Sequence, residues 1–165
     1  MSKHNKDKRK KRRQKSVKWR APQPSERGIV ERAASTMGVP PGKVVLMSQS
    51  GPKLSARLLE LVQPEWNNAR DDKGAQNLIG AAILAWNLAL DPDEEREAEI
   101  ADAAKKLSHC DPGRYAMIRG SLAVLVARKL ALFPDDDRYV MEFDLYRTPG
   151  GWHLNVASLM PDNDA

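Results

Sequence analysis

The sequence predicts an α+β protein, with a mostly helical body of four to five helices around a buried central helix and a C-terminal antiparallel β-hairpin packed on it. Two observations support this fold class. Residues 75–90, AQNLIGAAILAWNLAL, are apolar at twelve of sixteen positions and are rich in Ala and Leu, which favour helices. Near the C-terminus the hydrophobic period then changes from 3.6 residues to 2. A chain of 165 residues can bury a core of its own without staples.

The first half of the body is expected to contain two short helices. One spans about 26–37, is capped by Ser25 and has an apolar stripe of Ile29, Val30, Ala33, Ala34 and Met37. The run 44–47 is a candidate strand. The second helix begins near Pro52 with Ser50 or Gly51 as its cap, and it buries Leu54, Leu58, Leu61 and Val62. A polar loop, 67–74, leads to the central helix.

The central helix, about 75–90, has apolar residues nearly all round its circumference, which is typical of a helix buried on most sides. A membrane span is the alternative interpretation, but a span needs about 20 apolar residues, and this run is shorter and contains Asn87. We expect Asn87 to be a buried amide with satisfied hydrogen bonds. Gly80 destabilises a helix interior by roughly 1 kcal/mol relative to Ala, so we expect a neighbouring element to approach closely there.

Two longer helices follow. Asp91, Pro92 and Glu94 form a capping-box pattern for a helix at about 92–107, which buries Ile100, Ala104 and Leu107. Asp111 and Pro112 repeat this start for a helix at about 112–132. The residues expected on its buried side are Tyr115, Ile118, Leu122, Leu125 and Leu132. Between the two helices lies Cys110, which we expect to be a half-buried thiol of the connection rather than a nucleophile.

The C-terminal segment is expected to form the β-hairpin. Tyr139, Met141, Phe143 and Leu145 alternate with more polar residues, and the turn TPGG follows at 148–151. If Thr148 pairs with Gly151, then Leu145 faces Leu154 and Phe143 faces Val156, and the apolar rows share one side. That side should pack on the helices, because a lone hairpin is only marginally stable in water.

The other hairpin face is a low-priority candidate site. It carries Glu142, Asp144, Tyr146 and His153, and Asp144 and His153 would be diagonal neighbours. Such a pair can act as acid and base or hold a metal weakly. The alternative is an ordinary solvated sheet face, and we expect that alternative, with an inert surface. The sequence predicts no catalytic residue, no metal ligand and no cofactor.

The net charge of +5 conceals two parts of opposite sign. Residues 1–20 contain eleven Lys or Arg and one acid, which gives +10, whereas the remaining sixteen bases and twenty-one acids give −5. Residues 1–24 have few apolar side chains, so we expect a disordered basic arm and linker. Residues 25–160 are expected to form one globular domain, and 161–165 a frayed acidic end.

The basic arm, residues 1–20, gives the strongest indication of function. Dense Lys and Arg neutralise phosphates and release counterions, which favours nucleic acid or a ribonucleoprotein as partner. Trp19 lies between two bases and can stack on a nucleobase, or it can pack on the body. The residues expected to bind are Lys8, Arg9, Lys10, Lys11, Arg12, Arg13, Lys15, Lys18, Trp19 and Arg20. The alternatives are a solubilising tail or an acidic protein partner.

Cysteine use and the N-terminal pattern restrict the protein class. A single cysteine excludes an internal disulfide framework and a Cys-based zinc cluster. No apolar segment follows the basic start, so no secretory signal is expected, and we expect a cytoplasmic location, or a nuclear one in a nucleated cell.

Three functional hypotheses remain. The first is a non-enzymatic accessory protein that binds nucleic acid through the arm and a partner through the body. The second is a protein-interaction or structural module with a solubilising tail. The third is a small enzyme that uses the polar hairpin face.

Overall fold

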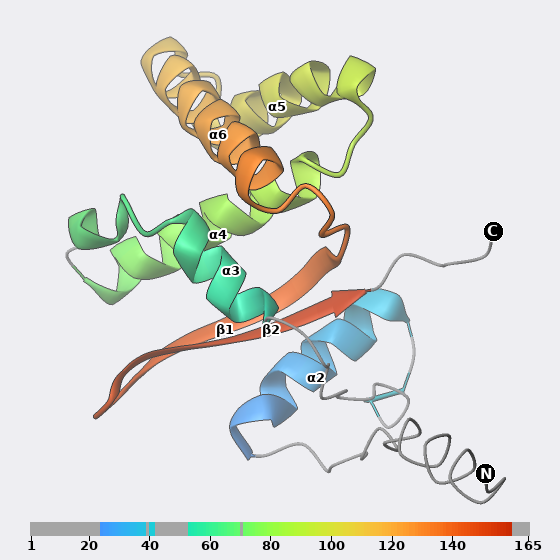
Figure 1. Ribbon diagram of the computed structural model, residues 1–165, viewed down its shortest axis with the longest axis vertical. Helices are drawn as coiled ribbons and strands as arrows, with labels where there is room; N and C mark the ends of the chain where they lie inside the picture. Colours follow the sequence, from blue (N-terminus) through green and yellow to red (C-terminus); the bar gives the residue numbers. More distant parts are fainter. Residues whose placement is uncertain (1–23, 39, 42–52, 70, 160–165) are drawn as a thin grey trace, which may run out of the picture.

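The computed structural model describes residues 24–38, 40–41, 53–69 and 71–159, and it confirms the α+β fold (Figure 1). Five α-helices and one hairpin occur in this part of the chain. They are α2 (Pro24–Met37), α3 (Leu54–Leu61), the 3-10 helix η2 (Trp66–Asn68), α4 (Asp72–Leu88), α5 (Asp93–Ser108), α6 (Pro112–Leu132), β1 (Tyr139–Thr148) and β2 (Gly151–Leu159). The arm, the candidate strand at 44–47, the expected caps Ser50 and Gly51 and the acidic end lie outside the described residues.

The hairpin lies between two helical layers (Figure 1). On one side α2 contacts both strands and no other described element. On the other side α4 contacts β1 and α3 contacts β2. The pair α5 and α6 forms a further layer, in which α6 packs on α4 and α5 packs mainly on α6. The helix α4 is therefore central, as predicted from residues 75–90.

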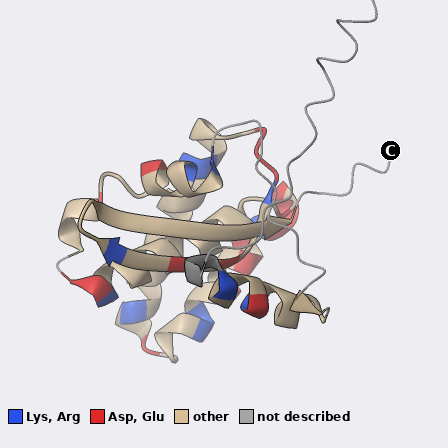
Figure 2. Ribbon diagram, turned by 90° about the horizontal axis from the view of Figure 1, so that it is seen from below, with Lys and Arg blue, Asp and Glu red and all other residues tan. Residues whose placement is uncertain are grey.

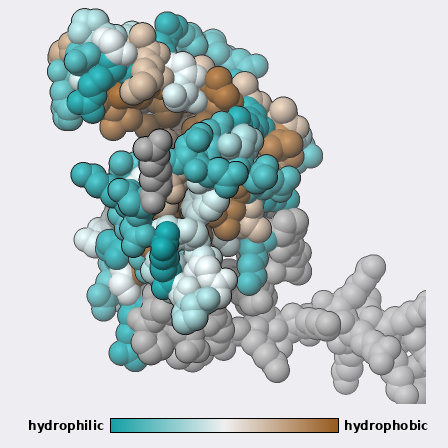
Figure 3. Space-filling model, turned by 90° about the vertical axis from the view of Figure 1, so that its left-hand side faces the viewer, coloured by the Kyte–Doolittle hydropathy of each residue, from teal (hydrophilic) through white to brown (hydrophobic). Residues whose placement is uncertain are grey.

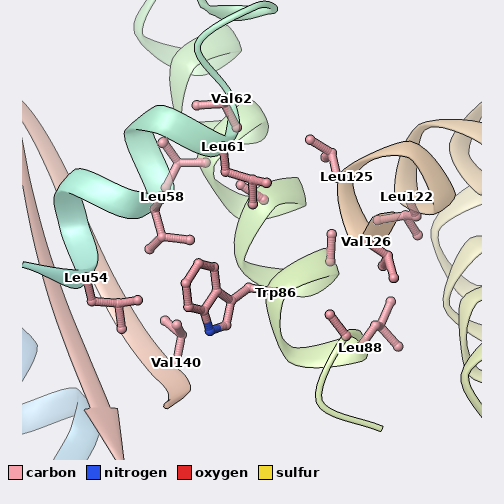
Figure 4. Close-up of a cluster of buried hydrophobic side chains, with 14 of the residues drawn as sticks. Leu54, Leu58, Leu61, Val62, Trp86, Leu88, Leu122, Leu125, Val126 and Val140 are labelled. Atoms are coloured by element: carbon pink, nitrogen blue, oxygen red, sulfur yellow. The ribbon is translucent and has the colours of Figure 1, made fainter. Parts of the chain in front are cut away.

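The core is built on one side of α4. Trp86 is fully buried, and Figure 4 shows its ring between Leu54 and Leu58 of α3 and Val140 of β1. Leu122, Leu125 and Val126 of α6 approach α4 from the other end of the same cluster. The opposite side of α4 is only half-buried. No atom lies within 4 Å of a Cβ built on Gly80, so the expected close approach at this residue is wrong.

Two adjacent residues at the end of α4 fix the start of β1. Trp86 Nε1 donates a hydrogen bond to the carbonyl oxygen of Arg138 at 2.8 Å. Asn87 Nδ2 donates to the carbonyl oxygen of Val140 at 2.8 Å, and the Val140 N–H donates to Asn87 Oδ1 at 2.9 Å. The side-chain amide of Asn87 thus satisfies both backbone groups of Val140, as a neighbouring strand would. The predicted hydrogen bonds of the amide are thus confirmed, although Asn87 is half-buried rather than buried.

The hairpin has the predicted register, with one irregularity. Thr148 pairs with Gly151, Leu145 with Leu154 and Phe143 with Val156. A β-bulge between Val140 and Glu142 then shifts the alternation by one residue. Val140 consequently faces the core, whereas Tyr139 is exposed, which corrects the predicted apolar row at its first positions.

Helices α2 and α4 begin at residues other than the predicted ones. The helix α2 begins at Pro24, which suits a first turn, so Ser25 is not its cap. The helix α4 begins at Asp72, because the Asp71 carboxylate accepts a hydrogen bond from the Gly74 N–H at 2.7 Å. Within the expected loop at 67–74, residues 67–68 belong to η2 and residues 72–74 to α4.

Of the N-terminal caps predicted for α5 and α6, the cap of α6 is confirmed and the cap of α5 is wrong. Asp111 accepts from the Arg114 N–H at 2.9 Å and begins α6 at the predicted residue. The helix α5 has Pro92 as its cap, with no side-chain bond, so Asp91 is not the cap. Arg96 Nη2 instead donates to the Asp91 carbonyl oxygen at 2.6 Å and holds this turn.

Two residues expected in the core are exposed. Leu107 of α5 is 47 % exposed and Leu132 of α6 is 46 % exposed, because each lies at the edge of the stripe that its helix buries. Helix α3 begins at Leu54 rather than near Pro52. The burial predicted for Leu54, Leu58, Leu61 and Val62 is confirmed, with Val62 as the cap at the end of the helix.

Replacing Trp86 tests the central helix. Trp86→Ala should lower the free energy of unfolding by about 3–5 kcal/mol, because it leaves a cavity and removes the hydrogen bond to Arg138. Chemical denaturation measures the change. Trp152→Ala is the control. Because the Trp152 ring is half-buried, its loss should lower the free energy of unfolding by less. Equal losses in the two variants would contradict a core centred on α4.

Candidate functional site

The arm residues predicted to bind nucleic acid, from Lys8 to Arg20, lie outside the described residues. In the described part of the body, eight of the fourteen Lys and Arg side chains form ion pairs. Figure 2 shows Lys and Arg interspersed with Asp and Glu rather than gathered on one face. The ion pairs are Arg32–Glu142, Arg57–Asp136, Arg96–Asp93, Lys106–Asp102, Arg119–Glu97, Arg128–Glu65, Arg138–Asp136 and Arg147–Asp72. Most described Lys and Arg side chains are therefore neutralised locally.

The polar hairpin face is partly covered rather than solvated, which corrects the expectation for Glu142, Asp144, Tyr146 and His153. Helix α2 packs on this face and buries Ile29, Val30, Ala33 and Ala34 there. Arg32 Nε donates to Glu142 Oε2 at 3.2 Å, and its Nη2 donates to the Phe143 carbonyl oxygen at 3.2 Å. Glu142 thus serves to attach α2 to the strand.

The remaining residues of this face do not form an acid–base pair. The rings of Tyr146 and His153 stack with their centres 5.6 Å apart and an angle of 18° between the planes. Asp144 is opposite Asn155, and no bond joins it to His153 in the described structure. No group of three or more potential metal-ligating side chains occurs among the described residues. The arrangement offers a small aromatic surface and no assembled chemistry.

The connection between α5 and α6 also differs from its prediction. Cys110 is exposed rather than half-buried. His109 and Cys110 both adopt left-handed backbone conformations, with φ of 50° and 66°. Such a conformation is uncommon for residues other than glycine, and here it reverses the chain between two packed helices within three residues. The thiol is a feature of this turn.

A buried cluster of charges at the end of α6 was not predicted. Asp136 accepts hydrogen bonds from Arg57 of α3 and from Arg138, whose Nε lies 2.7 Å from Asp136 Oδ1. Lys129 of α6 is only 1 % exposed, and its Nζ lies 5.3 Å from the centre of a Trp86 ring. The cluster joins α3, α6 and the start of β1 around the indole of Trp86.

Burial and ion pairing set the charge states in this cluster. Burial lowers the pKa of Lys129, and the negative charges of Asp136 and Asp137 oppose that shift only in part. Burial alone would raise the pKa of Asp136, but the hydrogen bonds and charges of Arg138 and Arg57 outweigh it, so its pKa lies below the usual value. An amine with a lowered pKa can act as a nucleophile, but the side chain of Lys129 is enclosed, so the cluster is structural.

An open pocket of about 800 Å³ lies between α4 and α6, and we call it the α4–α6 groove. Its walls are Gly74, Leu78 and Ala81 of α4 and Ala116, Gly120 and Val124 of α6. Its polar lining residues are Glu65, Asn68, Asn77 and Ser121. Figure 3 shows hydrophobic residues gathered in the upper part of the molecule, where α5 and α6 lie. This volume and lining fit a binding surface for an apolar ligand or a partner's side chains.

One end of the groove is closed by an ion pair. Arg128 donates two bonds to the Glu65 carboxylate, at 2.7 and 2.8 Å, and a third to the Leu61 carbonyl oxygen at 2.6 Å. The hydrogen bond from Arg128 lowers the pKa of Glu65. The bidentate geometry fixes η2 against α6 and keeps this end of the groove charged on one side.

Helix α6 exposes apolar side chains at the groove. Met117 is 64 % exposed and Val124 is 54 % exposed, and the neighbouring Ala116, Gly120 and Ser121 are also exposed. The apolar periodicity of α6 predicted its buried side and not this surface. The available signal was the spacing of uncharged residues at 113, 116, 117, 120, 121 and 124, which share one side of a helix.

No protein-family model, curated protein or solved structure matches the chain. Among the described residues, no helix has both the length and the apolar character that crossing a membrane requires.

Lys129 provides a test of the charge cluster. The folded pKa of Lys129 lies below its unfolded value, so the unfolded chain binds more protons between the two pKa values and stability rises with pH across that window. Lys129→Met should remove this rise and leave stability at neutral pH unchanged or higher, because a similar volume remains without a buried charge. Denaturation at several alkaline pH values measures both effects.

Lys129→Ala is the matched variant for packing. It removes the same charge but leaves space beside Trp86, so it should destabilise by roughly 2–5 kcal/mol relative to Lys129→Met. A large loss in Lys129→Met itself would show that the charge over the indole is stabilising, in contradiction to this account.

Proposed function

We propose that the protein is a non-enzymatic accessory protein that binds nucleic acid or a ribonucleoprotein through its N-terminal arm and a protein partner through its body. The observation that carries the proposal is the separation of charge, with +10 in residues 1–20 and −5 in the remainder. A phosphate-binding element needs free bases, and the arm has them in excess over its single acid.

The ion pairs of the body support this division of labour. Most described Arg and Lys side chains are held by carboxylates, as in Arg57 with Asp136 and Arg119 with Glu97, so phosphates would have to displace an existing partner. The net negative body also repels nucleic acid at long range. We therefore expect the arm to bind the nucleic acid. Because its bases would contact phosphates rather than base edges, binding should be only weakly sequence-selective.

The α4–α6 groove supports the second part of the proposal. An exposed apolar surface beside a pocket is typical of a protein-interaction site. The same observation favours the second candidate function, a protein-interaction module whose tail only adds solubility. In either case the protein would act in the cytoplasm, or in the nucleus of a nucleated cell.

Deleting residues 1–20 tests the role of the arm. Full-length protein should bind duplex DNA with a slope of log affinity against log salt of roughly −4 to −5, if about five bases engage at about 0.9 per phosphate. The truncated protein should not bind. Fluorescence anisotropy over a salt series measures both.

The matched control keeps the arm at its full length. Changing the six bases from Lys8 to Arg13 to Gln removes charge without shortening the chain, and it should reduce both affinity and slope. A truncated body that binds as tightly as the whole protein would assign binding elsewhere. Absence of binding by full-length protein at low salt would leave the interaction module as the function.

Trp19 tests whether the arm also contacts bases. Trp19→Ala should weaken binding to single strands more than to duplex, by roughly 1–3 kcal/mol for one stacked base, because only unpaired bases present a free face. Trp19→Phe should retain most of the affinity. A lower melting temperature with an unchanged ratio of single-strand to duplex affinity would show instead that Trp19 packs on the body.

A further inference from the structure

The exposed side of α6 has the composition of an interface. From Gly113 to Ala127 its exposed residues are small or apolar, apart from Arg114 and Arg119. Arg119 is paired with Glu97 and points to α5. Arg114 has no ion pair and no side-chain hydrogen bond among the described residues. An uncharged strip more than two turns long, with a single free cation at one end, is unusual on a free helix surface.

The strip contains both projections and hollows. Met117 and Val124 project from α6 as two of the most exposed large apolar residues in the described chain. Gly120 lies between them and lines the groove, and a Cβ built on it would meet no atom within 4 Å. With Ala116 and Ala81 it gives the groove a shallow floor of small residues. A helix can approach such a surface closely, because small side chains leave room for a neighbour's larger ones.

These projections and hollows are arranged to fit a second copy of the same surface. In an antiparallel pair of α6 helices centred between Gly120 and Ser121, Met117 of one copy lies opposite Val124 of the other. The two Met117–Val124 contacts then flank the small residues Gly120 and Ser121, which meet at the centre and let the helices approach closely. Such self-complementarity about a twofold axis is what an isologous interface requires.

The charges agree with the same arrangement. An antiparallel pairing with that centre sets Arg114 opposite Ala127 of the second copy. Ala127 precedes Arg128, which holds Glu65 through two hydrogen bonds. The Glu65 carboxylate retains acceptor sites after those bonds, so the free guanidinium of Arg114 has an anionic partner at each end of the interface.

We propose that the α4–α6 groove is a homodimer interface in which two α6 helices pack antiparallel around Gly120. The inference rests on the proposed function only in taking the groove as the partner surface of the body, and it names that partner as a second copy of this chain. It does not depend on what the arm binds. A dimer carries two basic arms, so binding of the second arm to one nucleic acid becomes intramolecular and raises the overall affinity.

Sedimentation of full-length protein over a concentration series, without nucleic acid, tests the dimer. Wild type should dimerise, and Met117→Glu should raise the dimer dissociation constant roughly tenfold or more, because it places a carboxylate in the apolar centre. Tyr139→Glu is the control, since Tyr139 is 50 % exposed on β1, away from the groove, and should leave the dimer unchanged. A wild type that is monomeric at every concentration, or a dimer indifferent to Met117→Glu, overturns the proposal.

Cross-linking tests the geometry. In a Cys110→Ser background, Ser121→Cys lies next to the twofold axis and should form a covalent dimer on oxidation. Ala127→Cys is exposed on the same helix but far from its own copy, so it should remain monomeric under the same conditions. Efficient self-linking of Ala127→Cys overturns the antiparallel arrangement.

The same variants separate this inference from the proposed function. Met117→Glu should keep the salt-dependent binding of a single arm while losing the added affinity of two arms on a long nucleic acid, by about tenfold or more. Loss of nucleic-acid binding in a wild type that still dimerises would refute the function of the arm alone. Retained binding in a wild type that is always monomeric would refute the dimer alone.

Discussion

The contact between the end of α4 and the start of β1 determines where the sheet lies. Trp86 and Asn87 are adjacent, yet one side chain fills the core and bonds to Arg138 while the other bonds to both backbone groups of Val140. Because β1 is an edge strand in a two-stranded sheet, its backbone needs partners that no third described strand supplies. Asn87 supplies them at the start of β1, and Arg32 supplies one at Phe143. The position of the hairpin, and thus of α2 beyond it, follows from these bonds.

Around the indole ring of Trp86, the core contains charged side chains as well as apolar ones. The cluster contains Lys129 of α6, Arg57 of α3, and Asp136 and Arg138 just before β1. Its one anion, Asp136, is shared by the cations. Removing Asp136 would take away the anion that Arg57 and Arg138 share, so the cluster tolerates little change at this residue. The cluster joins α3, the end of α6 and the segment that leads into β1, so these three parts of the chain are held together beside Trp86.

Local sequence patterns predicted the elements that depend on local physics. The Asp111–Pro112 start of α6, the register set by Thr148 and Gly151, and the burial of Trp86 follow from capping, turn chemistry and periodicity. The bulge at Met141 carries no glycine or turn signal, and it became necessary only because both Val140 and Leu145 face the core. Lys129 shares a stripe with Leu122, Leu125 and Val126, but helical spacing alone does not show that a lysine is enclosed. The cover of α2 over Glu142 and the groove beside α6 depend on how helices cross, which is a property of the assembled chain.

Helix α2 contacts the hairpin and no other described element, and this has a mechanical consequence. A segment held by one surface opens with a free energy set by that surface alone, independently of the rest of the core. The arm precedes α2 in the sequence, so tension along the arm acts on α2 and the hairpin before it reaches α4. The Arg32–Glu142 pair and the four buried side chains of α2 are the attachment that such tension would load. Detachment of α2 would release Glu142 and the Phe143 carbonyl oxygen while Trp86 and its neighbours stay packed, so this part of the hairpin face becomes accessible under force without global unfolding.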